Sequence, residues 1–132
     1  MNDEVKKILE ENMWDLATVS HNRPNVVPVA FKEVMEDGKL AVGDVFLSQT
    51  LKNLEESGGA IAVSAYDAKK LQGYQVQGTA SYIKEGPMVD KYKQIVESMF
   101  HGACTAKGVL IITPERIIVT TPGADNKKVL SV

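Results

Sequence analysis

The sequence has few of the features that mark secreted or membrane proteins. Cys104 is its single cysteine, so no disulfide can form within the chain and nothing requires an oxidising compartment. No apolar run approaches the roughly 20 residues that a membrane-spanning helix needs. The opening residues, MNDEVKKILEEN, lack the apolar core of a signal peptide. We therefore expect a cytoplasmic protein that does not associate with membranes.

The sequence also lacks a strong excess of charge of either sign. The chain has 15 Lys and Arg against 17 Asp and Glu, which gives a formal net charge of −2. Phosphate contacts with DNA or RNA need concentrated Lys and Arg, and this sequence has no basic cluster. The composition therefore argues against a nucleic-acid-binding protein.

Motifs for catalysis and metal binding are missing as well. His21 and His101 do not stand at metal-ligand spacing from each other or from Cys104. No glycine-rich phosphate loop of the GxGxxG or GxxxxGK type occurs, and no Gly-x-Ser-x-Gly motif of the hydrolases. We predict no metal site, and the sequence identifies no catalytic side chain.

Apolar residues, by contrast, are plentiful. They make up 44% of the 132 residues, with 24% charged and 6% aromatic residues, which is enough to build a hydrophobic core. The length suits one domain, and no repeat, linker or low-complexity segment divides the chain. We predict a single domain over residues 1–132.

The first half of the chain predicts a helix, three strands and a second helix. Apolar residues at helical spacing indicate a helix over 3–13, with Met13 as its last apolar residue. Asp37-Gly38 is a strong hairpin signal between two strands. Pro28 cannot donate to a strand ladder, so its strand should lie at an edge, carry a bulge or face something other than backbone at that point. The predicted strands are 15–20, 25–35 and 39–45, and the helix that follows is 48–57, ended by Gly58-Gly59.

The second half predicts four more strands and one helix. Period-two alternation in the strand 73–84 places Gln75 and Gln77 on a polar face opposite an apolar one. Pro87 opens a helix whose apolar stripe runs from Met88 to Phe100. The remaining predicted strands are 60–66, 108–113 and 115–121. Hairpin-type connections imply antiparallel pairing, so we predict a mainly β protein, a six- to seven-stranded antiparallel barrel with flanking helices.

Two polar features leave alternatives open. Ser48, Gln49, Thr50 and Asn53 stand at the start of a helix, where hydroxyls and free N–H groups can bind an anion. The same hydroxyls of Ser48 or Thr50 would equally serve as ordinary N-caps. Gln77 either faces solvent or offers its amide to a heterocycle in a site or a dimer interface.

Three stretches in this order resemble a known family. They are RPNVVPVAF (residues 23–31), AVGD followed by SQTLKNL (41–44 and 48–54), and GYQVQGTA (73–80). Together they are similar to the FMN-binding split barrels of the pyridoxamine 5′-phosphate oxidase-like family, and most similar to its short single-domain members. The resemblance implies a homodimer with a flavin at the subunit interface.

The resemblance also implies roles for particular residues. Pro28, Val29, Ala30 and Phe31 would run beside the isoalloxazine ring, and the turn from Gly43 to Ser48 would approach the ribityl chain. The phosphate would be surrounded by four residues, Ser48, Gln49, Thr50 and Asn53. Gln77 would come from the groove wall or from the partner subunit. Many relatives carry Lys or Arg where this chain has Gln49, so the positive charge would have to come from Lys52, Arg23 or Lys32.

These observations lead to an expected function and an alternative. We expect an FMN-binding oxidoreductase or flavin electron carrier with a small-molecule or redox-protein electron partner, in which the flavin supplies the chemistry. The chain shows no C-terminal extension with the Arg and His residues that grip pyridoxal phosphate, so the oxidase activity itself is not expected. The alternative is a barrel that binds another planar cofactor, haem or a deazaflavin, or a non-catalytic binding protein. His21 and His101 would matter more in that case.

Overall fold

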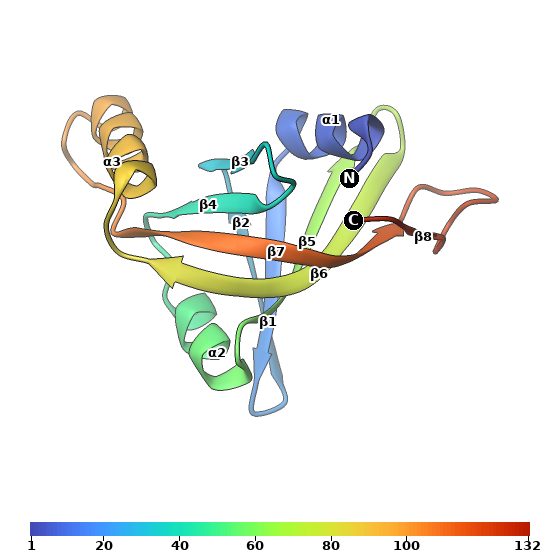
Figure 1. The fold of residues 1–132 in the computed structure, drawn as a ribbon, viewed down its shortest axis with the longest axis horizontal. Coiled ribbons are helices and arrows are strands. Elements are labelled where there is room, and N and C mark those ends of the chain that lie inside the picture. Colours follow the sequence, from blue (N-terminus) through green and yellow to red (C-terminus); the bar gives the residue numbers. More distant parts are fainter.

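The computed structural model describes residues 1–132 as one curled sheet with three helices (Figure 1). The elements follow in the order α1 (Asp3–Glu11), β1 (Trp14–Ser20), β2 (Arg23–Val29), β3 (Lys32–Val34), β4 (Leu40–Asp44), α2 (Gln49–Ser57), β5 (Ala60–Asp67), β6 (Gln72–Ile83), α3 (Pro87–Met99), β7 (Gly108–Val119) and β8 (Val129–Leu130). The eight strands pair antiparallel in the order β2-β1-β5-β6-β7-β4-β3, and β8 pairs with β7. This arrangement confirms the predicted antiparallel split barrel.

Alternation along the strands gives the sheet one buried face. One register-paired row crosses five neighbouring strands from β2 to β7 and points into the core: Val27, Leu16, Val63, Val76 and Ile117. Side chains one position along each strand point to the opposite face, as the pleat requires. Helix α1 adds Val5, Ile8 and Leu9 to the same core, so it closes one end of the half-barrel.

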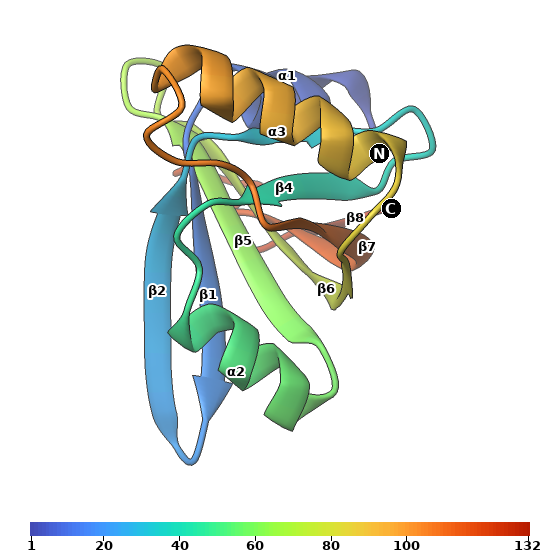
Figure 2. The same ribbon diagram turned by 90° about the vertical axis from the view of Figure 1, so that its left-hand side faces the viewer.

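Helices α2 and α3 cover different parts of the sheet (Figure 2). Helix α3 lies across β4 and packs Val89, Tyr92 and Val96 into a second, smaller core. Helix α2 lies beside β1 and β5 and buries Leu54 in the main core. None of the three helices has the length and apolar character to cross a bilayer.

Most predicted turns and helix ends have the expected chemistry. The β3–β4 hairpin turns at Asp37-Gly38, where Gly38 has a φ of +87°. Gly58 takes the left-handed conformation at the end of α2, and Pro87 occupies the first turn of α3. Asn2 caps α1 by accepting a hydrogen bond from the Val5 N–H at 2.9 Å. Local backbone requirements explain why these positions could be predicted.

Two predicted strand boundaries were wrong. The chain from 108 to 119 is one strand rather than two, because a bulge opposite Gln77 and Gly78 accommodates Pro114 without breaking the pairing. A Cβ atom at Gly78 would collide with the carbonyl oxygen of Thr113, so the bulge needs glycine there. Conversely, the predicted strand 25–35 is interrupted at residues 30–31.

That interruption is where the chain passes from one edge of the sheet to the other. Strand β2 ends at Val29 on one edge, and β3 begins at Lys32 on the opposite edge. Phe31 stays attached to the sheet because its carbonyl oxygen accepts a hydrogen bond from the Gly43 N–H at 2.8 Å. As an edge strand, β2 tolerates Pro28, which agrees with the prediction made from proline chemistry.

Two predicted helices are shorter than expected. Helix α1 ends at Glu11, and Met13 lies beyond it with an exposed side chain rather than in the apolar stripe. Helix α3 ends at Met99, and its buried face is Val89, Tyr92 and Val96. Phe100 therefore lies just outside α3, where it is partly exposed. Both Met13 and Phe100 are available to a surface site.

Candidate functional site

The passage between the two sheet edges borders a groove, called here the crossover groove. It has a volume of about 380 Å³ and is lined by residues 27–31, Gly43, residues 45–47, Met13 and Phe100. No lining residue has a charged or polar side chain. A groove of this size and apolar character suits the planar, apolar part of a cofactor.

All three phenylalanines of the chain line this groove. Phe31 comes from the β2–β3 passage, Phe46 from the loop after β4, and Phe100 from the end of α3. Phe46 is 79% exposed and Phe100 40% exposed, although aromatic side chains usually supply core packing. The rings of Phe31 and Phe100 meet edge to face, with centroids 6.0 Å apart. Two exposed aromatic residues and the partly buried Phe31 converge on one groove from three segments, which indicates a binding surface.

The structure brings half of the predicted site residues together in this groove. Pro28, Val29, Ala30, Phe31 and Gly43 all line it. The sequence did not indicate Met13 or Phe100, and it covered Phe46 only as part of the turn from Gly43 to Ser48. Their convergence on the groove depends on the tertiary fold, so local sequence patterns do not reveal it.

The predicted phosphate residues lie next to the groove, at the start of α2. Leu47 lines the groove, and Ser48 follows it as the N-cap residue of α2. The Ser48 side chain makes no capping hydrogen bond, so its hydroxyl does not stabilise the start of the helix. In the first turn of α2, the Leu51 N–H donates to the Ser48 carbonyl oxygen at 3.1 Å, while the N–H groups of Gln49 and Thr50 make no hydrogen bond, and there is no acidic side chain. The helix start therefore offers donors and a favourable dipole to an anion.

The other predicted phosphate residues have partners within the fold. Thr50 and Asn53 are buried, whereas Gln49 is exposed. The Asn25 amide donates to the Thr50 Oγ1 at 3.2 Å, and the Asn53 amide donates to the Thr18 Oγ1 at 3.1 Å. The Gln49 amide in turn donates to the Asn53 Oδ1 at 2.8 Å. These bonds attach α2 to β1 and β2, which gives Thr50 and Asn53 a structural reason to be polar.

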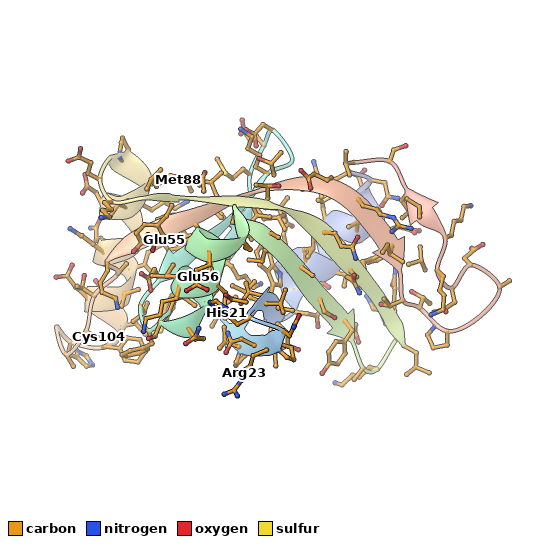
Figure 3. The ribbon with its side chains drawn as sticks, turned by 90° about the horizontal axis from the view of Figure 1, so that it is seen from below. His21, Arg23, Glu55, Glu56, Met88 and Cys104 are labelled. Carbon is orange, nitrogen blue, oxygen red and sulfur yellow. The ribbon has the colours of Figure 1, made fainter.

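The three candidate cations have different surroundings. Lys32 donates to the carbonyl oxygens of Leu9 and Glu10 at 3.0 and 3.4 Å, and its ammonium lies 5.2 Å from the Trp14 ring centroid. Burial lowers the pKa of Lys32, partly offset by the charge of Glu10. Lys32 is thus engaged at the end of α1 and not with a phosphate site. Arg23 projects away from the body of the molecule (Figure 3), and Lys52 is exposed on α2 itself.

Gly43 has a structural explanation that the sequence did not reveal. A Cβ atom there would lie 2.8 Å from Cδ1 of Tyr92, which packs α3 against β4. The Tyr92 hydroxyl donates to the Glu33 carboxylate at 2.9 Å, and Lys91 pairs with the same oxygen at 2.7 Å. Desolvation favours a higher pKa for Glu33, but the hydrogen bonds from Lys91 and Tyr92 and the Lys91 charge outweigh it, so its pKa is lowered. Burial raises the pKa of Tyr92, as do its hydrogen bond to Glu33 and the charge of that residue.

Gln77 and the histidines lie elsewhere. Gln77 is on the outer face of β6, where its amide donates to the Gln75 Oε1 at 2.8 Å, and it lines a hollow of about 430 Å³ between strands. His21 is in the β1–β2 turn, with Nε2 3.1 Å from a Glu56 carboxylate oxygen (Figure 3). His101 is exposed in the turn after α3. Neither histidine lines the crossover groove.

Comparison with known proteins places this fold and groove in a family. The model of the family described as pyridoxamine 5′-phosphate oxidase matches residues 1–124, so the chain belongs to that family. This confirms the resemblance inferred from the three sequence stretches.

Individual relatives extend the match over the whole chain. The uncharacterized protein MJ0282 of Methanocaldococcus jannaschii is 30% identical over 99% of this chain and 88% of its own length. The crystal structure of HupZ from Group A Streptococcus is 27% identical, with a TM-score of 0.80 over 95% of this chain and 98% of that one. An FMN-binding protein from Syntrophomonas wolfei subsp. wolfei has a TM-score of 0.77 at 18% identity, covering 92% and 87% of the two chains. An F420 reductase has a TM-score of 0.66 at 17% identity, covering 89% and 98%. At these identities the last two show a shared fold alone.

Proposed function

We propose that this protein is an FMN-binding flavoprotein that acts as an oxidoreductase or flavin electron carrier. The observation that carries the proposal is the continuity of two surfaces: an apolar groove bordered by all three phenylalanines runs directly into an uncapped helix start. FMN has the same two parts, a planar ring system and a phosphate. When bound, it would supply the electron-transfer chemistry that the protein's own side chains do not provide.

The residues present fit such a cofactor in distinct ways. Phe31 and Phe100 would contact the ring system, together with the backbone of residues 28–31. The Ser48 hydroxyl and the N–H groups of the first turn of α2 would bind the phosphate. Lys52 would supply the positive charge, since Lys32 is engaged with α1.

We also propose that the protein works as a homodimer formed through the outer face of the sheet. A register-paired row on that face has small side chains at its centre and runs through Val26, Ala17, Ala62, Gln77 and Arg116. Val26 is 65% exposed, although it is apolar. Strand β2 borders both this face and the crossover groove, so a second copy packed here would approach the groove and could bring Gln77 to it.

The test is a binding titration with two ligands. The purified chain, freed of any cofactor, is titrated with FMN and with riboflavin, which has the same ring system without the phosphate. We expect FMN to bind at micromolar concentrations or below, and riboflavin to bind at least tenfold more weakly. Failure to bind FMN would overturn the proposal, and mass spectrometry of any co-purified ligand would then identify haem or a deazaflavin in its place.

A further inference from the structure

Asp44 is a buried carboxylate with no cationic partner. It is the last residue of β4 and has no exposed surface, although its neighbours Gly43 and Val45 both line the crossover groove. The two ion pairs of the protein, His21 with Glu56 and Lys91 with Glu33, do not include it. Burial of an unpaired charge costs stability. The presence of such a carboxylate next to the crossover groove therefore suggests that it has a function there.

Hydrogen bonds fix this carboxylate beneath the groove wall. The Leu47 N–H donates to its Oδ1 at 3.0 Å, and the Tyr82 hydroxyl donates to its Oδ2 at 2.5 Å. Both oxygens act as acceptors, which is the behaviour of an ionised carboxylate. Leu47 belongs to the groove wall, so the charge is held in place by the same loop that carries Phe46.

Tyr82 is itself held in position. A Cβ atom at Gly108 would collide with the Tyr82 hydroxyl, so the glycine at the start of β7 leaves room for this bond. Burial raises the pKa of Tyr82, as do its hydrogen bond to Asp44 and the charge of that carboxylate. The tyrosine therefore stays a neutral donor at physiological pH.

We propose that Asp44 sets the reduction potential of the flavin bound in the crossover groove, by placing a fixed negative charge behind the groove wall. The proposal rests on the proposed function. Two-electron reduction adds two electrons and, at neutral pH, one proton from solvent, so the bound ring gains one negative charge. A nearby carboxylate shielded from water disfavours that added charge, and the potential is lowered.

The experiment measures the midpoint potential of the FMN-loaded protein, with dithionite as the reductant and a reference dye in the same cuvette. Asp44→Asn keeps the shape and the acceptor for Leu47 but removes the charge. We expect the ratio of reduced to oxidised flavin at a fixed potential to rise at least tenfold, which is about 30 mV for a two-electron couple.

Two further variants separate charge from structure. Tyr82→Phe removes one donor but keeps the carboxylate, so the less screened charge should lower the potential, in the direction opposite to Asp44→Asn. Asp67→Asn makes the same chemical change at the last residue of β5, where the carboxylate accepts a hydrogen bond from the Lys69 N–H, and it should leave the potential unchanged.

Specific outcomes would overturn the inference. An Asp44→Asn protein that binds FMN with the wild-type potential would do so, as would Asp44→Asn and Tyr82→Phe shifting the potential in the same direction. If Asp44→Asn does not fold, a potential of Tyr82→Phe that is unchanged or higher than that of the wild type would also overturn the inference. A wild-type chain that binds no flavin would instead contradict the proposed function, and this inference with it.

Discussion

Gly43 lines the crossover groove through its backbone, while the space where a side chain would project is taken by the Tyr92 ring. The family resemblance implied that the turn from Gly43 to Ser48 approaches the ribityl chain of a flavin. The structure adds a second requirement, the packing of α3 on β4. A glycine in a predicted site can therefore serve the opposite side of its strand.

Gly43→Ala tests which requirement dominates. We expect the variant to lose about 1–3 kcal/mol of unfolding free energy, because the added methyl group overlaps Tyr92. Chemical denaturation measures the loss, and a Tyr92→Leu background should reduce it through relief of the overlap. A variant with wild-type stability but weakened FMN binding would show that the glycine serves the ligand instead.

Glu33 makes the stability of the fold sensitive to acid. Its pKa is lowered in the folded protein, so it contributes stability that is present above its ordinary value near 4.5 and is lost as pH falls through the folded value. Glu33→Gln should remove this part of the pH dependence. The change in unfolding free energy should be less than about 1 kcal/mol, because the pair with Lys91 is partly exposed. Denaturation of both proteins at pH values between neutral and strongly acidic is the measurement. Parallel curves down to the lowest pH would contradict the assignment.

At the scale of an element, α2 divides its polar residues between two tasks. Asn53 and Thr50 bond to β1 and β2, whereas Ser48 makes no bond that supports the helix. The resemblance grouped all of them around a phosphate. Their different partners allow the structural and ligand-binding roles to be separated by mutation.

Ser48→Ala and Asn53→Ala form a matched pair for this purpose. Ser48→Ala should change the unfolding free energy by less than about 0.5 kcal/mol, yet reduce the preference for FMN over riboflavin. Asn53→Ala should cost about 1–3 kcal/mol, because Thr18 and Gln49 lose their partner. Thermal or chemical denaturation and the two-ligand titration provide the readouts. Equal destabilisation by both changes, with the FMN preference kept, would contradict the division.

The elements that the sequence predicted correctly are those fixed by local chemistry. Asp37-Gly38, Gly58 and Pro87 each meet a backbone requirement that can be read from neighbouring residues. The single strand β7 was missed because its Pro114 is accommodated by a bulge that depends on Gly78 in another strand. Phe46 and Phe100 were likewise not singled out as site residues, because their role depends on residues distant in the sequence: only the folded chain brings them to Phe31.

At the scale of the whole molecule, the outer face of the sheet and the crossover groove share β2. Stable protein interfaces bury about 800 Å² per partner, and the small side chains of Ala17 and Ala62 at the centre of the outer row allow close approach of a second copy. The proposed dimer and the proposed cofactor site are therefore physically connected, and disruption of one should weaken the other.

Ala62→Glu tests that connection at the centre of the outer row. A charge there should be buried without a partner in the dimer, so sedimentation should shift from twice 14.4 kDa to the monomer mass. FMN affinity should fall at least tenfold if the partner subunit covers the groove. Ala124→Glu makes the same change in the exposed C-terminal turn and should affect neither measurement. A wild-type protein that sediments as a monomer would contradict the proposed dimer.

The two-residue passage at Ala30 and Phe31 has a consequence for how this architecture can change ligands. It joins the sheet's edges through a short span of backbone, so the groove beside it arises from closing the half-barrel and not from an added loop. Part of the remaining wall comes from strands β2 and β4, and part comes from the loop after β4 and the end of α3, which lie outside the strand ladder. Substitutions in those two segments can reshape the groove without disturbing strand pairing, so one frame can host chemically different ligands across related proteins.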